Sequence, residues 1–444
     1  MQFITDKQTL DDLQIFAKPG GNSVYHIFNS TITRGGAQLL EEMFHYPLSN
    51  ATAINQRSDI IRQLASARVS FPFASVLFDA AEPYLENTDE RSRLTPETPG
   101  LGRQLEQLIA PDVEYQLIYK GVAAIIDILK GWYALLDEHH EKSADAYKDE
   151  LTAVARLLKE GGFAAIQQLQ TDRKLSHATV AEYDNLFRFR NKTVITQLLR
   201  HTYYLDVYTS VAKVAQERSF AFATALSSEE HCIVLQGLYH PFLEKPVTNS
   251  LEITPQNNIL FLTGANMAGK STFMKSLGIA LFLAHMGFPV PAANMNFSVM
   301  DGIYTTINLP DNLGAGTSHF YAEVLRLKKI VAGLQQGKRL FIVFDELFRG
   351  TNVKDAFDAT IAITAAFAEK NNSTFLISTH IVEAGEVLRK QCKNVDFIYL
   401  PTRLNGNVPE YTYRLEKGIT DDRHGMVIIR NEGILELLDK GKKI

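Results

Sequence analysis

A phosphate-binding loop is the first part of this sequence that could do chemistry. Residues 264–271 read Gly-Ala-Asn-Met-Ala-Gly-Lys-Ser, directly after the apolar run 259–263. This spacing predicts a strand, a turn and a helix whose backbone N–H groups face an anion. Lys270 would then reach the outer phosphates of a nucleotide, and the Ser271 hydroxyl would bind Mg²⁺. The alternative is a glycine turn that binds nothing, which the strand–loop–helix context disfavours.

Two carboxylates end a second apolar run. Residues 341–346 read Phe-Ile-Val-Phe-Asp-Glu, a pattern typical of a buried strand. Burying carboxylates is costly unless a metal or hydrogen bonds compensate, so the pair indicates chemistry. Asp345 would hold Mg²⁺ through its water shell, and Glu346 would orient and deprotonate an attacking water.

Two further segments predict contacts with phosphate. A third apolar run, 375–378, is followed by Thr379 and His380, at the sheet edge where a side chain can meet the γ-phosphate. A structural histidine is the alternative there. The loop 311–320 is rich in Gly and Ser and precedes an amphipathic helix, so Ser318 is a candidate N-cap. A helix start of this kind also binds anions, either in its own site or in that of a partner.

Together these motifs resemble the C-terminal portion of MutS-type DNA mismatch repair ATPases, which are relatives of the ABC ATPases. The Asn-Met inside the phosphate loop and the Arg-Gly-Thr that follows the acidic pair are far more selective than a phosphate loop alone. The segments that carry the resemblance are 263–272, 345–351 and 378–380, with weaker similarity at 239–241, 249–251, 414–419 and 424–426. Residues 29–59 and 204–218 look like parts of the family's helical lever domain.

The resemblance implies ATP and Mg²⁺ as cofactors and a homodimer formed through the ATPase domain. It makes Glu346 the catalytic base and His380 the γ-phosphate sensor, with Ser318 reaching across to the partner's nucleotide. Ser271 and Asp345 become the metal-side residues. The nucleotide contacts become Gly264, Asn266, Met267, Gly269, Lys270, Ser271 and Thr272.

Two departures from the family pattern bear on these expectations. Ser318 lies between Thr317 and His319, where members usually read Arg-Ser-Thr-Phe, and this makes action across a dimer less secure. The aromatic that often stacks on adenine is replaced by Pro246 or Val247, so base stacking would weaken or use Tyr239 or Phe242.

We therefore expect a mostly helical core or lever domain over residues 1–226 and a P-loop ATPase domain with a mainly parallel sheet over 227–444. Lever-like sequence begins within the first thirty-odd residues, which leaves no room for the family's mismatch-reading and connector domains. Mismatch discrimination by this chain alone is thus not expected. The DNA-gripping clamp also looks abbreviated. A long helix is predicted from Tyr183 to Arg218.

Composition is that of an ordinary globular protein. Hydrophobic residues make up 45% and charged residues 21% of the 444 residues, and the net charge is -5, so nucleic-acid contacts would need a local basic patch. Cys232 and Cys392 suggest no disulfide framework, which favours the cytoplasm. The sequence shows no secretory leader at its start and no long apolar run, so no membrane contact is expected.

Two functional classes stay open, with a third less favoured. Arg188, Arg190, Lys192 and Arg200, interleaved with Phe187 and Phe189, could form a face that contacts the DNA backbone, although a solvated helix face with buried aromatics fits equally well. In the first class the protein is an ATPase that binds duplex or branched DNA. In the second it is an ATP-switched module that binds another protein and no DNA. A small-molecule kinase fits poorly, because such enzymes rarely need the acidic pair followed by Arg-Gly-Thr.

Overall fold

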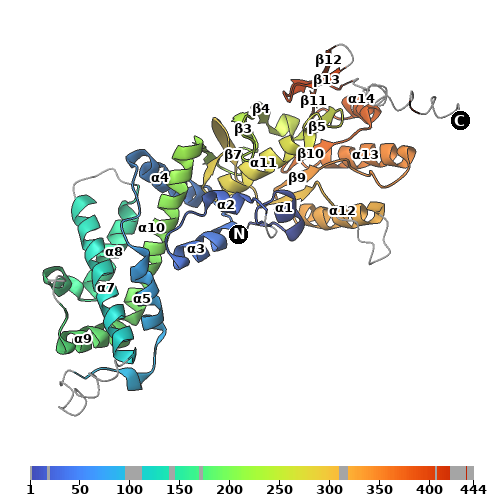
Figure 1. Ribbon diagram of the computed structural model, residues 1–444. Coiled ribbons are helices and arrows are strands. Elements are labelled where there is room, and N and C mark those ends of the chain that lie inside the picture. The colour runs from blue at the N-terminus through green and yellow to red at the C-terminus, as the bar shows by residue number, and fades with distance from the viewer. Residues whose placement is uncertain are drawn as a thin grey trace. The chain divides into compact units, whose positions relative to one another are not determined.

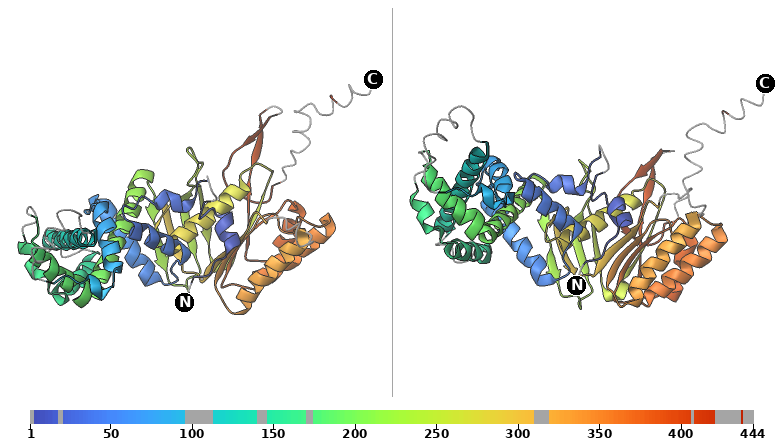
Figure 2. Two further views of the ribbon diagram at one scale, coloured as in Figure 1. Left: turned by 60° about the horizontal axis from the view of Figure 1, so that its bottom comes forward. Right: turned by 90° about the horizontal axis from the view of Figure 1, so that it is seen from below.

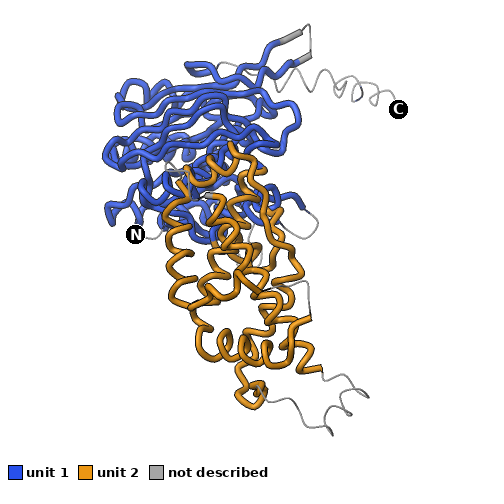
Figure 3. Tube along the Cα trace, turned by 90° about the vertical axis from the view of Figure 1, so that its left-hand side faces the viewer, with its two compact units in different colours: residues 1–28, 43–58, 214–444 blue, residues 29–42, 59–213 orange. Residues whose placement is uncertain are grey.

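The chain folds into two units, and each contains more than one segment of the sequence. The structure, a computed structural model, describes residues 3–17, 21–95, 113–139, 146–169, 174–309, 319–405, 408–420 and 437. Unit 1 comprises residues 1–28, 43–58 and 214–444, and unit 2 comprises 29–42 and 59–213 (Figure 3). The predicted domains, 1–226 and 227–444, are continuous in sequence, and that division stays a prediction.

A six-stranded, mainly parallel sheet lies at the centre of unit 1. Its order is β14-β11-β5-β10-β9-β8, with only β14 antiparallel to its neighbour. Figure 1 labels four of these strands, β11, β5, β10 and β9. Several strands are buried at every position, as expected when helices or other elements cover both faces of a parallel sheet. The strands are β5 (Ile259–Gly264), β8 (Gly302–Thr306), β9 (Leu340–Phe344), β10 (Thr374–Ser378), β11 (Val395–Leu400) and β14 (Glu416–Lys417).

Three helices cover one face of this sheet (Figure 2). They are α12 (His319–Gln335), α13 (Val353–Ala368) and α14 (Val382–Gln391). Ile330, Phe367 and Leu388, one from each helix, join alternate side chains of β5, β9 and β10 in a single hydrophobic core. A fourth helix, α11 (Lys270–His285), follows β5 and is buried at most of its positions, which explains why its sequence is apolar on nearly every side.

Smaller sheets flank the phosphate-loop region of unit 1. A four-stranded sheet has the order β2-β7-β3-β4, β12 and β13 form a hairpin, and β1 pairs with β6, an antiparallel partner far away in sequence. The strands are β1 (Ala221–Phe222), β2 (Thr224–Leu226), β3 (Ile233–Leu238), β4 (Asn249–Ile253), β6 (Pro289–Val290), β7 (Asn294–Ser298), β12 (Thr402–Asn405) and β13 (Val408–Tyr411), with the short helix η4 at Pro255–Asn257. The N-terminal helices α1 (Lys7–Asp12) and α2 (Val24–Phe28) also belong to unit 1.

Unit 2 is helical and has its own apolar core. Trp132, Phe78 and Phe163 are among its fully buried side chains. Its helices are α5 (Ser75–Glu86), η1 (Glu90–Ser92), α7 (Val113–His139), α8 (Lys148–Glu160), η2 (Phe163–Gln168), α9 (His177–Asp184) and η3 (Asn185–Arg190). Three more helices have residues in both units: α3 (Arg34–His45), α4 (Ala51–Ala67) and α10 (Lys192–Arg218). Among the described helices, none is at once long enough and apolar enough to traverse a bilayer.

The predicted helix from Tyr183 to Arg218 is interrupted, which corrects that expectation. The segment η3 is π-helical and separates α9 from α10. Within it, Phe187 is fully buried and Arg188 is almost so. The Arg188 guanidinium binds both carboxylate oxygens of Asp184, with Nε–Oδ1 and Nη2–Oδ2 distances of 2.5 and 2.7 Å. Of the proposed DNA-contacting side chains, Arg188 is therefore committed to an internal ion pair.

Candidate active site

The phosphate loop joins the end of β5 to the start of α11 through left-handed backbone. Gly264 and Gly269 have φ of 149° and 99°, and the non-glycine Met267 has φ of 70°. A Cβ on Gly264 would approach the Leu400 carbonyl oxygen to 3.2 Å, and one on Gly269 would approach Tyr413 Cδ1 to 3.1 Å. Glycine is thus required at both ends of the loop for conformation and for space. Met267 is largely exposed at the loop tip.

Lys270 lies at the first position of α11 with its ammonium group turned into the loop. Its Nζ donates hydrogen bonds to the carbonyl oxygens of Gly264 and Ala265, at 2.7 and 3.1 Å. Burial lowers the pKa of this ammonium group, while the carboxylates of Asp345 and Glu346 act in the opposite direction. A cation placed here offers charge-assisted hydrogen bonds to an anion held by the loop.

Asp345 and Ser271 meet directly, although they come from different elements. The Ser271 Oγ donates to Asp345 Oδ2 at 2.5 Å, and the backbone N–H of Asp345 donates to the Thr306 carbonyl oxygen at 2.9 Å. Burial raises the pKa of the Asp345 carboxyl, and the neighbouring Glu346 raises it further. The second oxygen, Oδ1, is buried and has no hydrogen-bond partner among the described residues.

These features fit a magnesium ion, which prefers hydroxyl and carboxylate oxygens. A cation beside Asp345 would remove the cost of a buried negative charge. Within the described ranges, no group of three or more His, Cys, Asp and Glu side chains forms a complete metal cage. Mg²⁺ usually completes its octahedron with water and phosphate oxygens, so two protein oxygens are enough at a nucleotide site.

Glu346 is held on both sides of its carboxylate. Its Oε1 lies 2.5 Å from His380 Nε2, and its Oε2 lies 3.0 Å from Arg349 Nη1. The hydrogen bond with His380 is the main cause of a lowered pKa for the Glu346 carboxyl. Glu346 also has φ of 53°, in the left-handed region that non-glycine residues rarely adopt. Backbone strain of this kind is typical of functional turns.

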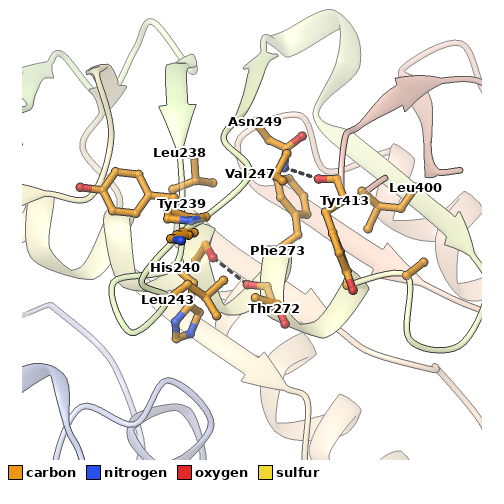
Figure 4. A pocket seen from close by; sticks show the side chains of 15 residues that line it. Leu238, Tyr239, His240, Leu243, Val247, Asn249, Thr272, Phe273, Leu400 and Tyr413 are labelled. Carbon is orange, nitrogen blue, oxygen red and sulfur yellow. Dashed lines mark hydrogen bonds between the residues drawn. The ribbon is translucent and has the colours of Figure 1, made fainter. Parts of the chain in front are cut away.

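Two pockets lie beside the phosphate loop. The first, of about 280 Å³, is lined by Ser271, Asp345, Glu346 and Arg349 together with residues 306–309 and Glu323. The second, of about 350 Å³, is lined by Gly269, Thr272 and Phe273 of the loop and α11, and by apolar side chains from the β3–β4 region (Figure 4). The first pocket contains the carboxylates of Glu323, Asp345 and Glu346 beside Arg349, a composition that suits a metal ion. The second pocket is mostly apolar, as a nucleobase requires.

The apolar pocket contains an aromatic side chain that the sequence did not indicate. Tyr413, just after β13, lines this pocket, and its carbonyl oxygen accepts a hydrogen bond from Asn249 Nδ2 at 3.0 Å. Of the aromatics expected to take over base stacking, Tyr239 lines the pocket, and Phe242 is not among its lining residues. No sequence motif indicated Tyr413, because it is far from the phosphate loop in sequence. Only the fold places it beside Gly269 of that loop.

The structure describes some of the other residues predicted from the sequence, and one lies outside the described ranges. Asn266 lies in the loop and Thr272 on α11, the latter at the apolar pocket. Ser318 lies outside the described residues, which resume with His319 at the start of α12. Arg349 was predicted only as part of a motif, and the structure places its guanidinium on Glu346.

Two family models match the chain. The family model described as MutS domain V matches residues 260–441, and that described as MutS domain III matches residues 8–212. The chain belongs to the MutS family. Domain V of MutS thus covers the phosphate loop, the acidic pair and His380, and MutS domain III covers most of the helical unit.

Two curated relatives carry the name DNA mismatch repair protein MutS. The protein from Persephonella marina is 30% identical over 281 residues, which is 61% of this chain and 31% of the relative. The protein from Streptococcus equi subsp. equi is 27% identical over 313 residues, or 68% of this chain and 35% of the relative. The chain thus spans about a third of the length of these MutS proteins.

Proposed function

We propose that this protein binds ATP with Mg²⁺ and hydrolyses it in a P-loop ATPase domain of MutS type. The observation that carries the proposal is the convergence of four side chains from two parts of the fold: Lys270 and Ser271 at the start of α11, and Asp345 and Glu346 directly after β9. Ser271 contacts Asp345, and the pocket beside them is lined by Glu346 as well. MutS domain V matches this part of the chain.

In this proposal each residue has a separate task. The loop N–H groups and Lys270 bind the phosphates, and Ser271 with Asp345 holds the metal side of the site. When bound, Mg²⁺ neutralises charge on the phosphate oxygens. Glu346 accepts the proton of the attacking water at a carboxylate oxygen, for which its lowered pKa keeps it charged. His380 holds the Glu346 carboxylate, so Glu346 can act as the base only after His380 has released it. In this proposal the release occurs when His380 turns from Glu346 to the γ-phosphate.

The apolar pocket is the proposed position of the nucleobase. Tyr413 and Tyr239 both line this pocket, and the Tyr413 ring is the proposed replacement for the aromatic missing at Pro246 and Val247. This accounts for base binding without the residue usual in the family.

We further propose a cytoplasmic homodimer that binds duplex or branched DNA and switches with ATP. The support is the family membership and the printed name of the two relatives. Cys232 and Cys392 are both free thiols, as a reducing compartment permits. Mismatch reading is not assigned to these residues.

The ion pair between Arg188 and Asp184 supports a second candidate function, that of an ATP-switched module that binds a protein partner and no DNA. With Arg188 bound to Asp184, the segment that had offered residue-level support for DNA contact loses its central cation. Steady-state ATP hydrolysis measured without DNA, with perfect duplex, with mismatched duplex and with a four-way junction separates the two. Stimulation by DNA that falls steeply with salt supports the first candidate, and unchanged rates support the second.

The test of the ATPase proposal uses two variants. Lys270→Ala should weaken ATP binding, whereas Glu346→Gln should retain binding and lose hydrolysis. A Glu346→Gln protein that hydrolyses at the wild-type rate would exclude Glu346 as the base. Ser318→Ala should lower turnover if the loop acts across a dimer, and mixing Ser318→Ala chains with Glu346→Gln chains tests this. A mixed dimer should regain one working site when Ser318 acts on the partner's nucleotide, and none when it acts on its own.

A further inference from the structure

The edge strand of the six-stranded sheet is completed by the N-terminal segment of the chain. β8 is the last strand in the sheet order, so its outer backbone groups need other partners. Ile4 forms an isolated parallel bridge with Gly302, and the Ile303 N–H donates to the Ile4 carbonyl oxygen at 2.9 Å. Beyond Ile4 the chain turns into α1, and backbone pairing with β8 ends there.

Side chains of α1 take over where this pairing stops. The Thr305 N–H donates to Thr9 Oγ1 at 3.1 Å, and the Ile307 N–H donates to Asp12 Oδ2 at 2.9 Å. The N–H groups of residues 303, 305 and 307, which follow the outer edge of β8, therefore all have acceptors. These acceptors are the Ile4 carbonyl oxygen, the Thr9 hydroxyl and the Asp12 carboxylate.

Asp12 accepts more donors than the edge alone requires. Its Oδ1 accepts the Asn308 N–H at 2.9 Å, and its Oδ2 also accepts the Thr305 hydroxyl at 2.8 Å. Gln8 Nε2 donates to Asp12 Oδ1 and to the Asn308 carbonyl oxygen, at 3.0 and 2.9 Å. Asp12 is only 2% exposed, so this set of donors compensates a carboxylate that is nearly cut off from water.

The segment that Asp12 holds is a wall of the acidic pocket. Residues 306–309 line that pocket together with Ser271, Asp345 and Glu346. The Thr306 carbonyl oxygen accepts the N–H of Asp345 at 2.9 Å. Displacement of residues 307 and 308 would therefore change the space available beside Asp345 without touching the phosphate loop.

We propose that Asp12 is a positioning residue for the metal side of the nucleotide site. Through two backbone N–H groups it fixes residues 307 and 308 so that the pocket beside Asp345 keeps its width. This inference rests on the proposed ATP site. A purely structural role, as a cap that stabilises α1 and β8, would instead affect stability without a specific effect on Mg²⁺.

The chain offers a matched control on the same helix. Asp6 is the N-cap of α1 and accepts hydrogen bonds from the Thr9 N–H and from Lys329 Nζ, and it pairs with Arg326. None of these partners lies in residues 307–309. Asp6→Asn therefore perturbs the attachment of α1 while asparagine still caps the helix. Asp12→Asn, by contrast, replaces one carboxylate oxygen with an NH₂ group. Either the Ile307 N–H or the Asn308 N–H then faces a donor and loses its acceptor.

Two measurements test the proposal. Hydrogen exchange of the nucleotide-free protein should show the amides of residues 307 and 308 exchanging about tenfold faster in Asp12→Asn, as expected for loss of a hydrogen bond to a charged group, and unchanged in Asp6→Asn. Calorimetric titration with ADP should show unchanged affinity in EDTA and an affinity in Mg²⁺ about tenfold weaker for Asp12→Asn alone.

Each outcome decides a different statement. Wild-type protein that binds no nucleotide would overturn the proposed function. Wild-type protein that binds normally, with equal Mg²⁺ dependence in Asp12→Asn and Asp6→Asn, would overturn the positioning role alone. Should Asp12→Asn fail to fold, Asp12→Glu carries the test, because it keeps the charge and moves the acceptor oxygens relative to the N–H groups of residues 307 and 308. Faster exchange at these amides with weaker Mg²⁺-dependent binding supports the role, and wild-type values refute it.

Discussion

The stability of unit 1 should depend on pH through His285, at the end of α11. The imidazole is fully buried, and its Nδ1 lies 2.8 Å from the Leu281 carbonyl oxygen while its Nε2 lies 3.0 Å from the Met300 nitrogen. A carbonyl needs a donor and an N–H needs an acceptor, so the ring is neutral with its proton on Nδ1. Protonation at Nε2 would set two donors against each other. Burial accordingly lowers the pKa of His285 from 6.5 to about 4.

The size of the effect follows from proton linkage. As pH falls, the unfolded chain binds a proton at a pKa near 6.5, and the native ring does not until about pH 4. The contribution of His285 to stability is thus present above pH 6.5 and is lost as pH falls toward 4. Between pH 7 and pH 5 this removes about 2 kcal/mol from the free energy of unfolding.

Guanidinium denaturation at pH 7 and pH 5 measures this loss. His240 has a pKa lowered to about 4 by burial as well, so wild-type protein contains more than one contribution. His285→Gln, which can donate to Leu281 and accept from Met300, should lose about 2 kcal/mol less than wild type over this interval. Equal losses in the two proteins, or imidazole resonances of His285 that titrate near pH 6.5, would refute the assigned neutral ring.

Three further predictions concern particular side chains. Phe348 has φ of 63° and packs its ring on Phe320, so in denaturation Phe348→Gly should be about 1 kcal/mol more stable than Phe348→Ala, and the reverse order would exclude strain. Tyr413→Ala should weaken ATP binding about tenfold in calorimetry and leave tripolyphosphate binding unchanged, whereas equal losses for both would place the base elsewhere. Arg188→Ala should destabilise the protein by about 3 kcal/mol, because it leaves the buried Asp184 carboxylate without its ionic partner. The salt dependence of DNA binding should stay unchanged, and a shallower dependence of the binding constant on salt would show that Arg188 contacts DNA.

The hydrophobic pattern of the sequence was sufficient to predict the strands β5, β9 and β10, which precede the phosphate loop, the acidic pair and His380. The runs before Gly264, Asp345 and Thr379 are mostly apolar and buried at every position, and a parallel sheet covered on both faces requires that pattern. Their parallel order then brings the ends of the strands to one edge. The contact between Ser271 and Asp345 follows from this geometry.

Other parts depended on contacts between distant segments and left no local signal. Tyr413 reaches the pocket through a hairpin, and Asp12 serves β8 from the opposite end of the sequence. The predicted helix from Tyr183 failed because the buried pair of Asp184 and Arg188 accompanies a π-helical segment, and helical periodicity does not distinguish such a segment from an α-helix.

The most direct test of the account is calorimetric titration of the protein with a non-hydrolysable ATP analogue, with and without Mg²⁺. Convergence of Lys270, Ser271 and Asp345 predicts one nucleotide per chain, tighter binding with Mg²⁺ in wild type, loss of that Mg²⁺ effect in Asp345→Asn, and weak binding in Lys270→Ala under both conditions. Binding that is indifferent to both substitutions, or no heat of binding from folded wild-type protein, would contradict it.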